Sequence, residues 1–385
     1  MSVRASPLTA GGGVIPASLL ASQRFLTIGD STSAGVGAGN GTGIAPEITG
    51  AYPKSVPVQA RDRLNALGIA ASSEAICCDN NNGTAATWPQ YRSTIETENA
   101  PFGNSSRTPS LGGNGQFRLS TGQAYSFTPT VPVSKVEFWY VRATNFGTFG
   151  LYLDGNPTPV ATFDQNGAEG FVRAEYTMPL GTHTIRFARI SGLVHGPFVV
   201  NAFDASAPRV HCMNAGARNW TTTDWIGATY PCSPLNAIAA VAPHIVNIDL
   251  GINDARPSSP APVSYAAFKA NMQTIINKAL SVGATVILTI PNPIAQYDDG
   301  NGWSEATMRQ AYYELAATNG CQLIDAPVLY AQAGFAATSP APYSEMNANN
   351  LFYDAFHPRA PVFAVEGAAL GDAIKTALIV RGAYG

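Results

Sequence analysis

Four short polar clusters carry the residue types that hydrolytic chemistry requires. They are Gly29-Asp30-Ser31, Asn214-Ala215-Gly216, Gly251-Ile252-Asn253-Asp254 and Asp354-Ala355-Phe356-His357. A serine hydroxyl becomes a strong nucleophile when an imidazole accepts its proton, and the second ring nitrogen of that imidazole must be held by a partner. His357 is the only histidine of the chain with an aspartate, Asp354, three positions before it. The pattern predicts Ser31 as a nucleophile, His357 as its base and Asp354 as the acid that orients the base.

Three of the clusters come directly after short apolar runs, residues 24–28, 209–213 and 244–250, which indicate buried strands. Elsewhere the apolar residues recur at helical spacing, as in residues 56–67 and 268–279. Strands that alternate with helices indicate a parallel sheet with helices on both faces, and ligands bind at the carboxyl ends of such strands. The clusters are therefore expected to meet at one edge of the sheet.

The pattern changes between residues 101 and 207. Short alternating runs there are separated by turn signals such as Asp154-Gly155-Asn156, which predicts an all-β sandwich. Phe138-Trp139-Tyr140 would place rings on both faces of one strand, so at least one ring should point away from the sandwich core. The predicted organisation is an N-terminal extension (1–23), an α/β domain in two parts (24–100 and 208–385) and a β-sandwich insertion (101–207).

In this order, the four clusters resemble the four signature blocks of the SGNH (GDSL-like) hydrolase family. The blocks are GDS, a glycine after an asparagine, GxND and DxxH. The resemblance covers about residues 24–90 and 208–380 and does not cover the β insertion. It implies a three-layer α/β/α fold around a parallel sheet, interrupted by the insertion.

The resemblance also implies a serine esterase that works through an acyl-enzyme on Ser31. The oxyanion hole would consist of the backbone N–H groups of Ser31 and Gly216 and the side-chain amide of Asn253, because fixed donors stabilise the tetrahedral intermediate. Gly83, within Asn80-Asn81-Asn82-Gly83-Thr84, also follows a strand-like run and is an alternative to Gly216.

Other polar and aromatic residues are expected to support the site. Asp30 and Asp254 should hold their own loops by hydrogen bonds. Trp220 and Trp303 follow predicted site loops and are candidates for lining a sugar or acyl site, although a single tryptophan more often packs in the core. The remaining histidines are expected to be structural or on the surface: His183, His195, His211 and His244.

Family members with such insertions are similar to O-acetylesterases of polysaccharide or peptidoglycan. The aromatic-rich insertion resembles a carbohydrate-binding module, so the resemblance implies removal of acetyl groups from a glycan. Two alternatives stay open. One is a broad carboxylesterase or lipase for small acyl esters. The other is a non-catalytic glycan-binding or phage tail-type protein, against which the complete set of catalytic residue types argues.

Charged residues make up only 12% of the chain, against the usual ~25%, and the formal net charge is −3. Without a run of lysine and arginine, nucleic-acid binding is not expected, and no apolar stretch approaches the ~20 residues of a membrane helix. A surface of uncharged polar residues favours an extracellular or virion-associated protein, although the first 22 residues make a poor signal peptide.

The five cysteines show no CxxC spacing, so a structural zinc site is not predicted. The proposed chemistry needs neither a metal nor a cofactor. Cys212 and Cys232 flank a loop and are a candidate disulfide pair.

Overall fold

The computed structural model describes residues 19–38, 54–77, 95–98, 111, 118–119, 124–227, 233–257 and 262–384. Its centre is a six-stranded sheet in the order β17-β16-β15-β1-β14-β2, whose adjacent strands all run parallel. The predicted parallel sheet is therefore confirmed. Its strands are β1 (Gln23–Gly29), β2 (Ala71–Ser72), β14 (Val210–Gly216), β15 (Ile245–Asp249), β16 (Thr285–Ile290) and β17 (Gln322–Asp325).

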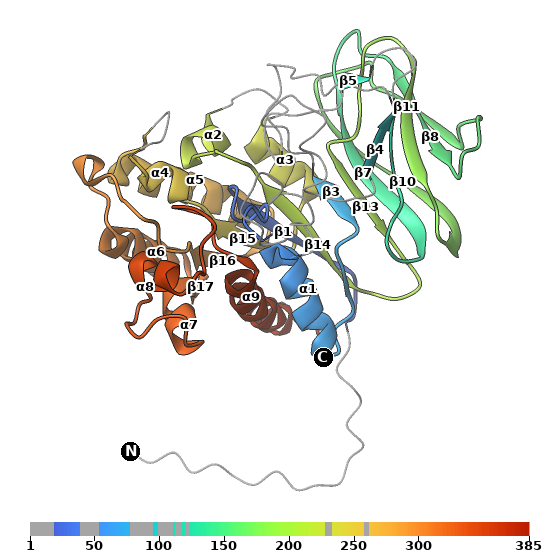
Figure 1. The fold of residues 1–385 in the computed structure, drawn as a ribbon. Helices are drawn as coiled ribbons and strands as arrows, with labels where there is room; N and C mark the ends of the chain where they lie inside the picture. The colour runs from blue at the N-terminus through green and yellow to red at the C-terminus, as the bar shows by residue number, and fades with distance from the viewer. Residues whose placement is uncertain are drawn as a thin grey trace, which may run out of the picture.

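Helices cover both faces of this sheet, which makes three layers (Figure 1). On one face pack α1 (Val56–Ala66) and α9 (Ala360–Val380), and on the other α3 (Pro234–Val241), α5 (Tyr265–Ser281) and α6 (Glu305–Asn319). Their buried residues recur at three and four positions, which keeps one stripe of each helix on the sheet. Shorter helices complete this part: α2 (Thr222–Ile226), α4 (Ile252–Ala255), α7 (Ala326–Gln332), α8 (Tyr343–Ala348) and the 3₁₀ helix η3 (Asp299–Asn301).

A second, β-rich part lies beside this α/β part (Figure 1). Its strands form a four-stranded antiparallel sheet, β10-β7-β13-β3, and a five-stranded one, β4-β6-β11-β8-β9, with a small pair β12-β5. Apolar side chains of the two larger sheets, such as Phe138 and Phe187, share one core cluster. The strands are β3 (Ala75–Cys77), β4 (Ile95–Glu98), β5 (Arg118–Leu119), β6 (Ala124–Phe127), β7 (Val133–Arg142), β8 (Thr148–Leu153), β9 (Ala161–Asp164), β10 (Gly170–Gly181), β11 (Ile185–Ser191), β12 (Val194–His195) and β13 (Val199–Phe203).

The β-rich part begins earlier than the sequence predicts. Strands β3 and β4 lie within residues 24–100, which the sequence pattern places in the α/β domain, yet β3 pairs with β13 and β4 with β6. The antiparallel strands therefore start at residue 75 and not near residue 101. A three-residue apolar strand looks the same in sequence whichever sheet it joins, so only its pairing partner decides the boundary.

The strand β7 joins the two parts through one ring. Phe138 and Tyr140 belong to the core of the β-rich part, whereas Trp139, on the opposite face of the strand, belongs to the core of the α/β part. The Trp139 indole Nε1–H donates a hydrogen bond to the Ala240 carbonyl of α3, at 3.0 Å. The prediction that one ring of this run points away from the β core is confirmed.

Candidate active site

The turn after β1 carries Ser31. Asp30 Oδ1 accepts hydrogen bonds from the Thr32 backbone N–H (2.9 Å) and the Thr32 hydroxyl (2.8 Å), and the Ala34 N–H donates to the Asp30 carbonyl (3.1 Å). These bonds wind residues 30–34 into a tight turn at the carboxyl end of β1. Ser31 is held on this turn with 6% of its surface exposed.

The imidazole of His357 bridges Ser31 and Asp354. Its Nε2 lies 2.9 Å from Ser31 Oγ, and its Nδ1 lies 2.8 Å from Asp354 Oδ2. Both distances are within reach of proton transfer and orientation. Gly37 allows the two segments to meet, because a Cβ at this position would lie 2.4 Å from the Pro358 carbonyl oxygen and 3.0 Å from His357 Cβ.

The carboxylate of Asp354 is held by several donors. Its Oδ1 accepts hydrogen bonds from the backbone N–H groups of Phe356 and His357, both at 2.8 Å. Partial burial pushes the pKa of Asp354 up, but the hydrogen bond and charge of His357 outweigh it, and the net pKa is lowered. Asp354 therefore stays negatively charged at neutral pH and is able to stabilise a protonated imidazole.

Asn292 positions this loop, and the sequence analysis missed it. Its side-chain amide donates to the Phe356 carbonyl (2.9 Å), and the Ala295 N–H donates to the Ala355 carbonyl (3.0 Å). Asn292 lies two residues after the end of β16, at the same edge of the sheet as the other clusters. Its place after a predicted strand was the signal that would have identified it.

The backbone N–H of Gly216 is engaged within its own segment, so the structure does not offer it as an oxyanion donor. It donates to Asn214 Oδ1 at 2.9 Å, while Asn214 Nδ2 donates to the Ser33 carbonyl at 2.8 Å. A glycine is required at position 216 for a steric reason, because a Cβ there would lie 2.4 Å from the Ala34 nitrogen. The alternative, Gly83, lies outside the described residues.

The segment after Gly216 contains a donor that the sequence analysis missed. The N–H groups of Ala217, Trp220 and Thr221 donate to Gly29, Ala217 and Asp224 respectively. Asn219 is exposed and has φ +62°, a left-handed conformation that asparagine tolerates better than most residues. Within the part of the chain that the structure describes, its backbone N–H has no hydrogen-bond partner.

Asn253 and Asp254 connect α4 to this same segment. Asn253 Nδ2 donates to the Trp220 carbonyl at 2.9 Å, which leaves the second hydrogen of the amide for another acceptor. Asp254 Oδ1 accepts from the Thr222 N–H (3.0 Å) and the Thr222 hydroxyl (2.5 Å). Burial raises the pKa of Asp254 to about 7. Asp254 therefore ties the α4 turn to the start of α2, as Asp30 ties its own turn.

Trp220 and Trp303 lie in the core and do not line an open surface, contrary to the sequence prediction. Each is at most 3% exposed. Trp303 Nε1–H donates to the Val263 carbonyl (2.7 Å), and its ring packs on Phe268, while Trp220 packs edge-on against Trp225. The position of a tryptophan after a strand does not predict whether its ring faces the core or the surface. Both of these rings pack in the core, where their large apolar area is buried.

The other histidines lie away from Ser31. His183 contacts Asp154 in the β-rich part, and His195 stacks on Phe146. Burial lowers the pKa of both His211 and His244 to about 4, so neither carries a charge at neutral pH.

Of the predicted disulfide pair, Cys212 is a free, buried cysteine, and Cys232 lies outside the described residues.

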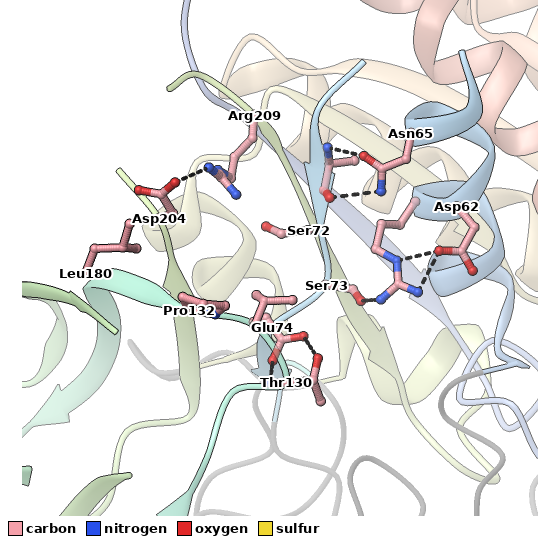
Figure 2. Close-up of a pocket in the computed structure, with 13 residues that line it drawn as sticks. Asp62, Asn65, Ser72, Ser73, Glu74, Thr130, Pro132, Leu180, Asp204 and Arg209 are labelled. Carbon is pink, nitrogen blue, oxygen red and sulfur yellow. Dashed lines mark hydrogen bonds and ion pairs between the residues drawn. The ribbon is translucent and has the colours of Figure 1, made fainter. Parts of the chain in front are cut away.

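Figure 2 shows a cavity of about 560 Å³, lined by residues such as Ser72, Glu74 and Arg209. It opens where α1 and the segment at Ser72–Glu74 face the β-rich part, and Ser72 pairs with the amino end of β14. Among its charged residues, Arg209 pairs with Asp204 and Arg61 with Asp62. Because it lies at the amino ends of the strands, this cavity is not the place where an ester would meet Ser31.

The described residues contain no group of histidine, cysteine, aspartate or glutamate side chains arranged to hold a metal ion. None of their helices combines the length and the apolar character that crossing a membrane would require.

Residues 195–362 match the model of the GDSL-like Lipase/Acylhydrolase family, a span that includes Asn253, Asp354 and His357 but not Ser31. The match spans less than half of the chain. No curated protein matches the sequence.

Solved structures resemble the chain more broadly. One described as a peptidoglycan O-acetylesterase in action has 14% identity and a TM-score of 0.61, over 94% of this chain and 92% of that one. The shared fold thus extends over nearly the whole length of both chains. Lower TM-scores mark a lipase/acylhydrolase from Enterococcus faecalis (0.33, 22% identity, 44% of this chain and 77% of that one) and a family two carbohydrate esterase from Clostridium thermocellum (0.32, 12%, 74% and 99%).

Proposed function

We propose that this chain is a serine esterase in which Ser31 attacks the ester carbonyl, His357 is the general base and Asp354 orients it. One observation carries the proposal: the His357 ring lies 2.9 Å from Ser31 Oγ and 2.8 Å from Asp354 Oδ2. An alcohol, an imidazole and a carboxylate in this arrangement are the parts of an activated nucleophile.

In the proposed reaction, His357 Nε2 takes the Ser31 proton as Oγ bonds to the carbonyl carbon. The tetrahedral intermediate collapses when the protonated imidazole returns that proton to the oxygen of the leaving alcohol, and the acyl group stays on Ser31. A water molecule then attacks the acyl-enzyme and gives a proton to His357, which passes it back to Ser31 Oγ. The acid leaves and the free hydroxyl is restored.

We assign the oxyanion hole to the backbone N–H groups of Ser31 and Asn219 and the side-chain amide of Asn253. Asn219 takes the place predicted for Gly216, whose N–H already binds Asn214. Within the described residues, neither the Ser31 N–H nor the Asn219 N–H has a hydrogen-bond partner. Asn219 directly precedes Trp220 in the chain, and the Asn253 amide donates to the Trp220 carbonyl, so both residues lie next to Trp220.

For the substrate, we propose O-acetyl groups on a carbohydrate. The support is the full-length likeness, at a TM-score of 0.61, to a structure described as a peptidoglycan O-acetylesterase. We further propose that the antiparallel sheets form a β-sandwich insertion of carbohydrate-binding-module type, beginning near residue 75 and ending near 207. The α/β domain then consists of the segments on either side.

The test compares the parent with Ser31→Ala on p-nitrophenyl acetate, butyrate and octanoate, and on acetylated xylan and O-acetylated peptidoglycan. Ser31→Ala should lose about 10³-fold or more of kcat with an unchanged melting temperature. Ser281→Ala, which removes an exposed hydroxyl at the end of α5, is the matched control and should keep the parent rate. A parent without activity on any of these esters, or an equally active Ser31→Ala, would refute the esterase. A rate that rises with acyl length would favour a lipase.

A further inference from the structure

The sheet face that packs on α1 and α9 changes character along its strands. Near the amino ends it presents apolar residues such as Phe25 and Ile245, which belong to one core cluster with α9. Two residues further on, the same face carries Thr27 and Asn247, and at the carboxyl end of β15 it carries Asp249. Because alternate residues of a strand share a face, this polar row lies directly below the turn that holds Ser31.

Three carboxyl groups are buried in and beside this row. Asp30, Asp249 and Glu366 are each at most 4% exposed. Their hydrogen-bond partners are neutral: Thr32 for Asp30, Ser33 for Asp249 and the Tyr330 hydroxyl, at 2.8 Å, for Glu366. Asp30 Oδ2 and Glu366 Oε1 are buried and accept no hydrogen bond from the described residues.

Such groups are costly unless they keep their protons. Burial, the charge of Glu366 and the charge of Asp30 raise the pKa of Asp249 well above its usual value. Burial also raises the pKa of Glu366, to about 7. A fold that needed only stability at this place would have used apolar side chains, so the position of Asp249 calls for another explanation.

Asp249 contacts the Ser31 turn through Ser33. The Ser33 hydroxyl donates to Asp249 Oδ2 at 2.7 Å, and the Ser33 carbonyl accepts from Asn214 Nδ2 at 2.8 Å. Ser33 also packs closely on β1, because a Cβ at Gly29 would lie 1.9 Å from Ser33 Oγ. Ser31 and Ser33 belong to the same tight turn, so the position of Ser33 determines where Ser31 Oγ lies relative to His357.

We propose that Asp249 is a positioning residue for the reaction, which holds Ser33, and with it Ser31, against the end of β1. The inference rests on the proposed esterase function. Among the described residues, the titratable groups that interact with Asp249 are Glu366 from α9, Tyr330 from α7, Tyr312 from α6 and Asp30 from the turn itself. An uncharged carboxyl or amide at this position accepts the Ser33 hydrogen bond equally well.

The test measures kcat and KM on p-nitrophenyl acetate for Asp249→Ala, Asp249→Asn, Ser33→Ala and the double variant Asp249→Ala/Ser33→Ala. Asp249→Ala should lower kcat by about 10- to 100-fold with little change in KM, because a misplaced nucleophile slows the chemistry and not the binding. Asp249→Asn should restore kcat to within about threefold of the parent. The double variant should lose no more than either single variant, since both remove one interaction.

Asn247→Ala is the matched control. Asn247 lies two residues earlier on the same face of β15, is equally buried, and accepts a hydrogen bond from the Thr289 hydroxyl at 2.8 Å. It should lower the melting temperature and leave kcat unchanged. If Asp249→Ala keeps the kcat of Asn247→Ala, or if the losses of the two single variants multiply, the positioning role is wrong although the esterase stands. A parent that hydrolyses no ester refutes the proposed function instead.

Discussion

His357 Nε2 lies 2.9 Å from Ser31 Oγ, although 326 positions separate the two residues in the chain. The two segments meet because β1 is one of the two middle strands of the sheet, so its carboxyl end is within reach of the loop before α9. Both partners belong to well-anchored turns, one held by Asp30 and the other by Asn292. The arrangement leads to four further predictions.

Asp354→Asn should lower kcat by at least about 100-fold at pH 7, with a small change in KM. The amide preserves the shape but cannot balance the charge of a protonated His357 or select its tautomer. The chain offers a matched control, since Asp154 Oδ2 also lies 2.8 Å from a histidine Nδ1, that of His183. Asp154→Asn should keep the parent rate on p-nitrophenyl acetate. Full activity in Asp354→Asn would show that the reaction does not require Asp354 to orient His357.

Asn219→Gly and Asn219→Val should separate the backbone of this residue from its side chain. Glycine accepts the left-handed conformation at no steric cost, whereas a β-branched residue resists it. If the Asn219 N–H stabilises the oxyanion, Asn219→Gly should retain kcat within a few-fold, and Asn219→Val should lose about 10²-fold or more. Steady-state kinetics on p-nitrophenyl acetate measure kcat for both variants. Equal rates in both variants would exclude the Asn219 N–H as an oxyanion donor and leave Gly83 or another residue as the candidate.

Glu366→Gln should stabilise the fold increasingly as the pH rises from 5 to 8. Burial raises the pKa of Glu366 from 4.5 to about 7, so the folded state holds the proton more tightly than the unfolded state. That contribution is fully present below about pH 4.5 and is lost as the pH rises through 7, at a cost of at most about 3 kcal/mol. The glutamine cannot ionise and avoids this loss. Urea unfolding of both proteins at pH 5 and pH 8 measures the difference.

Glu345→Gln provides a control of opposite sign. Hydrogen bonds from Thr338 lower the pKa of Glu345, so its contribution is present at neutral pH and lost on acidification. This variant should therefore be less stable than the parent at pH 8 and approach it at low pH. A stability difference for Glu366→Gln that does not change with pH would contradict the raised pKa.

Trp139→Phe should lower the free energy of unfolding by about 1–3 kcal/mol while kcat stays unchanged. The variant leaves the Ala240 carbonyl without its donor and opens space in the core that α3 shares with β7. Denaturant unfolding followed by circular dichroism measures the loss. Tyr152→Phe is a suitable control, because Tyr152 is only partly buried on the outer part of β8, under the guanidinium of Arg186. If Trp139→Phe has the same free energy of unfolding as the parent, this ring does not stabilise the contact between the two parts.

The sequence by itself determined the parallel sheet, the helices on its two faces, and the polar clusters that follow its strands. Those features are local, because an apolar run of five residues that ends in Gly-Asp-Ser shows both the burial of a strand and the start of a turn. The spacing of Asp354 and His357 is local too. Even the opposite facing of Trp139 and Phe138 follows from the two-residue period of a strand.

Only the tertiary structure decided which groups each polar atom would meet. The sequence predicts the Gly216 N–H as an oxyanion donor, but in the fold this N–H donates to Asn214. Ala75–Cys77 pairs within an antiparallel sheet that no local pattern specifies. Asp249 and Glu366 lie more than a hundred positions apart and became neighbours because β15 and α9 pack together. Hydrogen-bond partners and burial are properties of pairs of distant segments, whereas the periodicity of a sequence reports only on one segment at a time.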